Sequence, residues 1–400
     1  MGRRAKSDKS QSELIQDDLK QLGYDFRIND LDDGLEFSSV SMGGKWLRLT
    51  DVFEAVIRTQ LRDQGYGKKG KPGLAAVRDT ITTWANRNRY NPIKSYFETL
   101  ASKYQPVESG AYEIPSIAVY FENPDGMFKD WLFKWMVGSI AKLFDGQRNP
   151  MLVLVGPQNM GKSFFTEWLC PVKGHFLRDS INPDDKDSHI RLTDVFLWEV
   201  EELGATTRRA DIESLKAFIT RDEVKKRPAY GRHRVDKPAT CSFIGTVNHD
   251  GAGFLNDPTG STRFLSCEIN AINFDYSKDV DVNKLWSEAF WYYKHVPGSW
   301  KLDEWQRAKR NEINALYEVP SALADVISDL YEVTGSGQDF VATQEIRSAI
   351  DLHYKVSNEQ LFYRELKRVM KRLEVQDARG SYSNGDEHRR GYKGIKRRSI

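Results

Sequence analysis

The sequence predicts an α/β protein of three parts, in which a parallel-sheet domain stands between a small α+β region and a basic helical tail. From Met151 to Ile269, apolar strand-like runs alternate with helical patterns, which is typical of a parallel sheet. Before this stretch, strand-like and helical segments are mixed, and after it helices lead into a basic strand-like segment. We expect an N-terminal domain at 1–110, a central domain at 111–300 and a C-terminal domain at 301–400.

The first region has the pattern of a small α+β domain without a catalytic signature. Leu14 to Leu22 gives an amphipathic helix that ends at Gly23. Strand-like segments follow at 24–28, 35–40 and 46–49, and then helices at 51–62 and 74–86. We expect this region to act as a collar or as a docking domain for a partner.

The most informative segment begins at Met151. The apolar run to Val155 predicts a buried strand, and Gly156-x-x-x-x-Gly161-Lys162-Ser163 follows it directly, with a helix expected from Phe164. Strand, glycine loop and helix together form the context that a phosphate-binding loop needs, because backbone N–H groups and the helix N-terminus then surround a phosphate. The pattern predicts ATP as ligand, with Lys162 on the β- and γ-phosphates and Ser163 on Mg²⁺.

The segment from Phe128 to Phe144 carries apolar residues at helical spacing, including Trp131 and Trp135. Packing beneath the nucleotide domain is favoured over an aromatic platform for a ligand. Its lysines and its aspartate argue against a membrane span.

A phosphate-binding loop needs acidic and polar partners at the same edge of the sheet. Val195 to Trp198 predicts a strand that leads into Glu199, Glu201 and Glu202. Alternation along a strand places Glu199 and Glu201 on one face and Glu202 on the other. One glutamate would organise the metal and another would act as base, and a solvated strand end is the alternative.

Two further residues fit this site. The apolar run from Thr240 predicts a strand ending at Asn248, whose amide would orient the attacking water; a turn-forming asparagine is the alternative. Arg263 follows in a loop after the sheet and suits the charge that develops on the γ-phosphate, from its own or a neighbouring subunit. A surface ion pair is the other interpretation of Arg263.

The order of these segments resembles the virulence-associated protein E-like ATPases of phages, plasmids and genomic islands, which are related to superfamily 3 helicases in the AAA+ class. The resemblance covers about residues 110–270 and rests on the segments 156–163, 199–203, 227–232, 245–248 and 257–264. It implies a P-loop AAA+ type parallel-sheet ATPase domain.

The resemblance also implies roles for single residues. Gly156, Gly161, Lys162 and Ser163 match the Walker A loop. Glu199 and Glu202 match the acidic pattern of the Walker B region, which ranks them above Glu201, with Glu199 as the metal's carboxylate. Asn248 matches sensor 1 and Arg263 the arginine finger, but this chain has one arginine where the family often has two.

The basic run 225–237 occupies the place of the DNA-tracking hairpin of superfamily 3 motors. Basic groups would follow phosphates and an aromatic ring would stack on a base. A solvated basic loop is the alternative. We expect a hairpin tip near Gly231 and Arg232, and the candidate DNA contacts are Lys225, Lys226, Arg227, Tyr230, Arg232, His233 and Arg234.

Composition sets few further limits. The formal net charge is only +2, yet basic clusters recur at 3–9, 225–237 and 389–398, which favours a phosphate-rich partner. The scattered cysteines predict neither a zinc site nor a disulfide framework, and the polar start lacks a signal peptide, so we expect a cytoplasmic protein. Helices at 343–354 and 358–373 and a hairpin at Asn384-Gly385 make the tail winged-helix-like.

The sequence therefore predicts an ATP-dependent DNA helicase or translocase that replicates a mobile element. It would form a ring, expected to be a hexamer, with ATP between subunits and single-stranded or forked DNA as partner, and with a primase or initiator on another chain. An ATP-switched origin-binding or regulatory protein without unwinding activity is the alternative. A small-molecule kinase is disfavoured by Asn248, Arg263 and the basic run.

Overall fold

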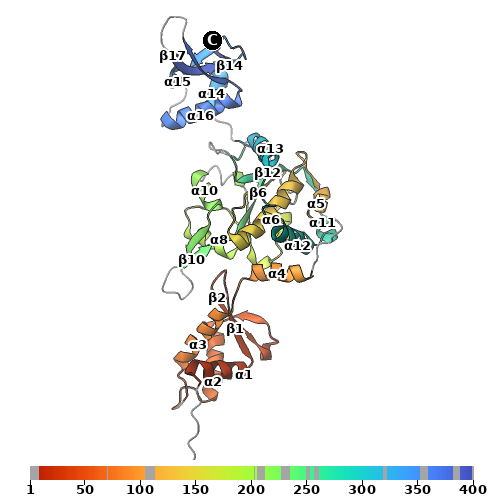
Figure 1. Ribbon diagram of the computed structural model, residues 1–400, viewed down its shortest axis with the longest axis vertical. Coiled ribbons are helices and arrows are strands. Elements are labelled where there is room, and N and C mark those ends of the chain that lie inside the picture. The colour runs from red at the N-terminus through yellow and green to blue at the C-terminus, as the bar shows by residue number, and fades with distance from the viewer. Residues whose placement is uncertain are drawn as a thin grey trace, which may run out of the picture.

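The chain folds into three bodies along one axis, with the N- and C-terminal domains at opposite ends of the central domain (Figure 1). The computed structural model describes residues 9–69, 71–103, 113–201, 203–204, 212–226, 235–248, 253–255, 261–318, 322–351, 359–381 and 388–398. Each body has its own hydrophobic core among these residues. None of the described helices is both long and apolar enough to cross a lipid bilayer.

The N-terminal domain is a four-stranded sheet, in the order β3-β2-β1-β4, with helices packed on it. The helices and the meander that the sequence predicted are confirmed, and β4 adds a parallel neighbour to β1. Its elements are α1 (Gln11–Gln21), β1 (Tyr24–Asn29), β2 (Gly34–Ser39), η1 (Val40–Met42), β3 (Trp46–Arg48), α2 (Asp51–Asp63), α3 (Leu74–Arg87) and β4 (Arg89–Tyr90).

The central domain is built on a five-stranded parallel sheet in the order β12-β6-β11-β8-β7. All residues of β6 (Met151–Gly156) are buried, as expected of a parallel strand covered on both faces. The other sheet strands are β7 (Phe176–Arg178), β8 (Leu197–Val200), β11 (Ser242–Asn248) and β12 (Phe264–Glu268). A two-stranded pair, β9 (Glu223–Lys226) with β10 (Val235–Pro238), stands outside this sheet.

Helices cover the central sheet. α6 (Phe128–Asp145) buries its tryptophans, and the indole N–H groups of Trp131 and Trp135 donate to Ser266 O and Phe243 O at 3.1 and 2.9 Å. The packing role predicted for this segment is therefore confirmed. The remaining elements are α4 (Pro92–Lys103), α5 (Glu113–Ile117), η2 (Ala118–Tyr120), β5 (Phe121–Glu122), α7 (Lys162–Leu169), η3 (Lys173–His175), α8 (Lys186–Asp194), α10 (Ile212–Ile219), β13 (Ala271–Ile272), α11 (Tyr276–Asp279), α12 (Val282–His295) and α13 (Glu304–Leu316).

The central core is longer than the sequence predicted at both ends. Phe97 of α4 and Ile313 of α13 are buried in the core cluster that contains β6. Both helices therefore pack with the central domain, although they lie outside the expected bounds of 111–300. Apolar residues alone do not tell which of two adjacent cores a helix joins, since that depends on the path of the chain.

The C-terminal domain contains the two helices and the hairpin strands that the sequence predicted. Its sheets are β14 with β18 and the three-stranded β15-β17-β16. The expected single basic strand is divided, because Gly394 adopts a φ of +84° between β17 and β18. Asn384-Gly385, where a turn was predicted, lies outside the described residues. The elements are α14 (Ala322–Leu330), β14 (Tyr331–Val333), β15 (Phe340–Ala342), α15 (Thr343–Asp351), α16 (Glu359–Arg372), β16 (Gln376–Ser381), β17 (His388–Lys393) and β18 (Ile395–Arg397).

Candidate nucleotide site

The glycine loop lies between β6 and α7, as the sequence predicted. Gly161 has a φ of +94° and Asn159 a φ of +62°, so the loop turns through left-handed conformations. A Cβ atom on Gly156 would lie 2.0 Å from the backbone oxygen of Ile269. Only glycine therefore fits at Gly156, the last residue of β6, and the loop 157–161 connects it to the start of α7.

Lys162 occupies the mouth of this loop. Its ammonium donates to Gly156 O and Pro157 O at 2.7 and 2.6 Å and lies 3.4 Å from the side-chain oxygen of Asn248. Asn248 pairs in register with Gly156 at the end of β11 and is exposed. Burial lowers the pKa of the Lys162 ammonium. The structure thus brings together two residues that the sequence assigned to one site.

Glu199 is buried within β8 rather than placed after it. Its Oε2 accepts hydrogen bonds from Thr166 Oγ1 at 2.6 Å and from Arg178 Nε at 2.8 Å. Its Oε1 has no hydrogen-bond partner among the described residues. Thr166 lies one turn beyond Ser163 on α7, so the carboxylate faces the phosphate-loop helix from the side. Glu202 lies outside the described residues.

Arg178, at the end of β7, was not found from the sequence. Its Nη2 donates to Ser163 O at 2.7 Å and to Glu167 Oε2 at 3.1 Å, while its Nε donates to Glu199. Exposed Glu201 lies 3.6 Å from the same Nε. Arg178 therefore connects the buried glutamate to the start of α7, and its apolar neighbours in the sequence gave no signal of this.

Arg263 lies at the opposite end of the sheet from Lys162. Its carbonyl accepts from Met151 N at 2.8 Å, at the start of β6, whereas Lys162 follows the end of that strand. Six residues of β-strand span about 17 Å at ~3.3 Å each. Within one subunit, Arg263 is therefore remote from the phosphate loop.

The loop that carries Arg263 is fixed by α13. Arg310 Nη1 donates to Thr262 O at 3.1 Å, and Asn314 Nδ2 donates to Ser261 O and Phe264 O at 2.9 and 3.0 Å. Arg263 itself is partly exposed, and its Nε is buried without a hydrogen-bond partner among the described residues. The backbone on both sides of Arg263 is thus held at this edge of the domain.

Two exposed aromatic rings flank the phosphate loop. Phe164, the second residue after Lys162, is 51% exposed, and Phe274 is 47% exposed. Their ring centroids are 5.8 Å apart, and a Cβ atom on Gly161 would lie 2.4 Å from the Phe274 ring. The two rings, tilted by 57° to each other, offer an exposed apolar surface beside the candidate phosphate site.

The predicted basic hairpin is described only at its base, where β9 and β10 pair. Lys225 is exposed, but Lys226 is buried, and its ammonium donates to Asp194 Oδ1 at 2.6 Å and to Leu31 O at 3.2 Å. The expectation that Lys226 contacts DNA is therefore wrong for this structure, because alternation along the strand turns it inward. The remaining candidate contacts lie outside the described residues: Arg227, Tyr230, Arg232, His233 and Arg234.

The residues present fit ATP and Mg²⁺. Gly156 and Gly161 carry no side chain at either end of the loop, Lys162 brings a cation, and Ser163 lies in the first turn of α7. The described residues contain no cluster of three or more histidine, cysteine or acidic ligands. A nucleotide-bound Mg²⁺ does not require one, since phosphates and waters supply most of its ligands.

The family of this chain is identified by comparing its sequence with profiles of known protein families. The profile of the virulence-associated protein E-like domain matches residues 109–319. The chain belongs to this family. A comparison with curated protein sequences gives no match.

The virulence-associated protein E-like domain holds the phosphate loop, Glu199, Asn248, Arg263 and the β9–β10 pair. Its end at 319 agrees with the extended central core, which includes α13. Most of the N-terminal domain and the C-terminal domain lie outside the match. Family membership therefore covers the candidate site but not the flanking domains.

The fold of the whole chain is shared with solved structures. An apo structure of the C-terminal region of NrS-1 (305–718) has a TM-score of 0.51 at 13% identity, covering 97% of this chain and 100% of that one. A second apo form of that region gives a TM-score of 0.50 at 13% identity, with the same coverage. At this identity the likeness establishes the fold alone, and it includes all three domains.

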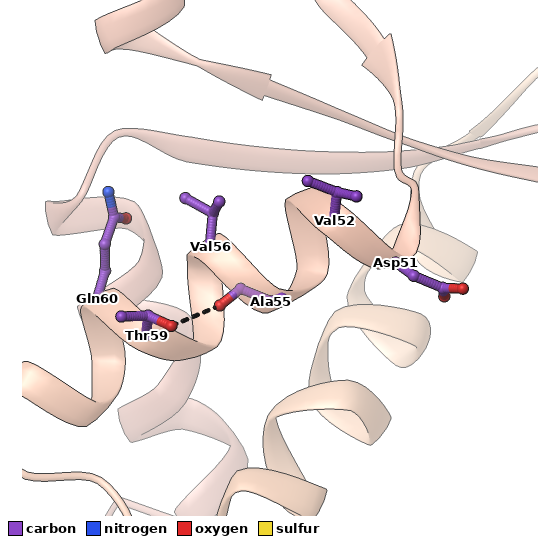
Figure 2. A pocket seen from close by; sticks show the side chains of 6 residues that line it. All are labelled: Asp51, Val52, Ala55, Val56, Thr59 and Gln60. Carbon is purple, nitrogen blue, oxygen red and sulfur yellow. Dashed lines mark hydrogen bonds between the residues drawn. The ribbon is translucent and has the colours of Figure 1, made fainter.

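A separate hollow lies on α2 in the N-terminal domain (Figure 2). It is lined by Asp51, Val52, Ala55, Val56, Thr59 and Gln60. Val52 and Val56 are exposed, and the Thr59 hydroxyl donates to Ala55 O at 2.9 Å. With one carboxylate and no cation in its lining, this hollow lacks the chemistry of the phosphate loop.

Proposed function

We propose that this chain is an AAA+ class ATPase that acts as a DNA helicase or translocase in the replication of a mobile genetic element. The observation that carries the proposal is the placement of Lys162 and Arg263 at opposite ends of β6. A subunit arranged in this way completes its site only with an arginine from a neighbour. This favours a ring, which we propose to be a hexamer, with ATP bound between subunits.

The roles of the residues follow from their positions. Backbone N–H groups of the glycine loop and the Lys162 ammonium would bind the phosphates, and the Ser163 hydroxyl would be a ligand of Mg²⁺. The metal ion, when bound, neutralises charge on the phosphates. Asn248 would orient the attacking water, since its amide lies beside Lys162.

The two family glutamates divide the remaining work. The carboxylate of Glu199, which accepts hydrogen bonds from Thr166 and Arg178, would support the ligand shell of the metal. Glu202 would accept the proton of the attacking water. Arg263 of the adjacent subunit would stabilise the negative charge that grows on the γ-phosphate.

Phe164 and Phe274 extend the site beyond the phosphates. Both rings are exposed, and both lie beside the loop that would hold the triphosphate. We propose that they provide a surface for the nucleobase, because an apolar ring face stacks on any base.

The test is the steady-state ATPase rate of the full chain at low salt, with and without single-stranded DNA. We expect DNA to stimulate hydrolysis, and a forked duplex to lose its displaced strand only when ATP is present. Stimulation without strand displacement would favour translocation alone. ATP and DNA binding without stimulation would contradict the motor.

One observation supports a second function. The C-terminal domain combines α15, α16 and the β16–β17 hairpin with exposed basic residues such as Arg390 and Arg397. A domain of this kind suits duplex binding, so an ATP-switched origin-binding protein without unwinding activity is the second candidate. Duplex affinity that changes with ATP, combined with no strand displacement, would favour it.

A further inference from the structure

The base of the β9–β10 pair is attached to the N-terminal domain by a buried ion pair. Lys237 of β10 lies 2.7 Å from Asp33 Oδ1, and the side chains are 11% and 9% exposed. The same ammonium donates a hydrogen bond to Asp30 O. The partners are some two hundred residues apart in the sequence, so only the docking of the two domains brings them together.

The turn between β1 and β2 is built to present Asp33. Asp33 adopts a φ of +58°, and Arg89 Nη2 donates to its Oδ1 at 2.8 Å. Leu31, at the tip of the turn, is 3% exposed and belongs to the core of the central domain, not to that of its own. The carboxylate is thus fixed by its own domain before it reaches Lys237.

Lys226 extends the contact to a third element. It lies on the same inward face as Lys237, since Val224 and Lys226 of β9 pair with Lys237 and Val235 of β10. Its ammonium bridges Leu31 O and Asp194 Oδ1. Asp194 is the last residue of α8, which leads directly into β8 and Glu199.

A cavity borders this junction of the β1–β2 turn, the β9–β10 base and the end of α8. Its lining includes Arg89, Lys94, Thr193, Lys237 and Thr240. The Thr240 hydroxyl is buried without a hydrogen-bond partner among the described residues. Beside this open space, the junction is held by the buried Leu31 and by the polar contacts of Lys226 and Lys237.

We propose that Asp33, Lys226 and Lys237 are positioning residues, through which the N-terminal domain orients β9–β10 and couples that pair to the strand of Glu199. A lysine whose charge is taken up in a buried ion pair does not serve as a DNA ligand. The coupling to DNA and ATP rests on the proposed function, whereas the orientation of β9–β10 does not.

The turn provides a matched pair of variants, Asp33→Asn and Asp32→Asn. Both remove one negative charge, but Asp32 pairs with Arg48 within its own domain, at 2.7 Å and 39% exposure. We expect Asp33→Asn to lower the stimulation of ATPase by single-stranded DNA by ~5-fold or more, with the DNA-independent rate unchanged. Asp32→Asn should match the wild type, and equal effects of both variants would overturn the proposal.

Salt dependence separates positioning from direct contact. A lysine that binds a phosphate of single-stranded DNA contributes ~0.7 to the slope of log affinity against log salt. We expect Lys237→Met to weaken DNA binding several-fold with an unchanged slope, and exposed Lys225→Met to reduce the slope. A reduced slope for Lys237→Met would make that lysine a DNA ligand and overturn its role as an anchor.

A structural measurement keeps the proposal testable if the protein does not hydrolyse ATP. Backbone hydrogen exchange at 223–226 and 235–238 should accelerate in Asp33→Asn and in Lys237→Met, but not in Asp32→Asn. The double variant Asp33→Asn/Lys237→Met should exchange no faster than the faster single variant. Each single variant already removes the same contact, the ion pair between Asp33 and Lys237. Unchanged exchange in both single variants would overturn the junction, while accelerated exchange in a protein inert to ATP and DNA would overturn only the proposed function.

Discussion

The phosphate loop and the β9–β10 base both bury lysines, but they bury them in different ways. Lys162 is 6% exposed and donates to carbonyls of its own loop, five and six residues away. Lys226 is 7% exposed and its partners come from α8 and from another domain. One lysine is positioned by its local sequence and the other by the tertiary fold.

The difference separates a lysine that remains available to a ligand from a structural one. The partners of Lys162 are neutral carbonyls, so its charge is available to a phosphate once the loop opens around one. The partners of Lys226 and Lys237 include the carboxylates of Asp194 and Asp33, which neutralise those charges permanently. Of these three lysines, Lys162 is therefore the better candidate for binding an anionic ligand.

The largest expected effect tests this distinction directly. Lys162→Ala should lower ATP hydrolysis by ~10³-fold, because phosphate charge loses its stabilising cation. Lys226→Met, measured in the same steady-state assay without DNA, should retain hydrolysis close to that of the wild type. Similar losses in the two variants would end the distinction between the two lysines.

The second-largest expected effect on hydrolysis concerns Arg263, which lies at the edge of the domain remote from Lys162. Arg263→Ala should bind ATP normally, in an equilibrium assay with labelled nucleotide, but hydrolyse it ~10²-fold more slowly or worse. Mixing it with Lys162→Ala subunits should restore part of the activity, because some interfaces then combine an intact loop with an intact arginine. If mixed rings form without any recovery, the site does not lie between subunits.

A smaller effect should come from Arg178. This arginine lies near the glycine loop but, unlike Lys162, it pairs with a carboxylate, that of Glu199. Arg178→Met should reduce kcat by ~10-fold with little change in KM for ATP, because Glu199 loses the donor that orients it. Arg178→Lys should recover part of the rate, since a cation is restored near the carboxylate. Thermal unfolding of both variants serves as the control, as an unpaired buried carboxylate also destabilises a fold.

The aromatic rings beside the loop should affect binding rather than chemistry. Phe274→Ala should weaken ATP binding by ~10-fold while leaving the affinity for inorganic tripolyphosphate unchanged, because only the nucleobase loses a stacking surface. Trp305→Ala, at another exposed aromatic position, is the control. Equal weakening for both ligands would place Phe274 on the phosphates instead.

The smallest expected effect is on the pH dependence of stability. It concerns Glu288, a buried carboxyl that has no ion-pair partner among the described residues, unlike Glu199 and Asp33. Glu288 accepts from Ile114 N at 2.7 Å, and burial raises the pKa of its carboxyl from the ordinary value of 4.5. The folded protein then retains a proton that the unfolded chain has lost. The stability contributed by this group is full below pH ~4.5 and declines as pH rises toward the folded-state pKa.

Glu288→Gln removes this titration. Relative to the variant, the wild type should lose on the order of 2 °C in Tm between pH 4 and pH 7, measured by thermal scans at fixed ionic strength. A constant difference across that range would mean that the carboxyl titrates alike in the folded and unfolded chain.

The sequence was most informative where neighbouring residues act together. The strand, glycine loop and helix at 151–169 were predicted correctly because every part of that unit is contiguous. Asn248 was placed correctly because parallel strands bring their carboxyl ends to one edge. The helix at 128–145 was assigned to the core because its tryptophans recur at helical spacing.

Other features depended on partners far along the chain. Arg178 had no local pattern, and its contact with Glu199 arises only because β7 and β8 pair. The basic run at 225–237 was interpreted as one DNA-facing surface, although strand alternation turns Lys226 and Lys237 toward carboxylates. Helices α4 and α13 were assigned to the flanking domains because their apolar faces do not specify which core they join.

By itself, the sequence determined the α/β class, the unit of strand, glycine loop and helix, and the kinds of residue that surround it, because these follow from contiguous patterns of burial and backbone freedom. Only the tertiary structure decided which charges remain available to ligands. Availability depends on whether a carboxylate from a distant segment lies within a few ångströms, and that distance is fixed by the packing of whole domains.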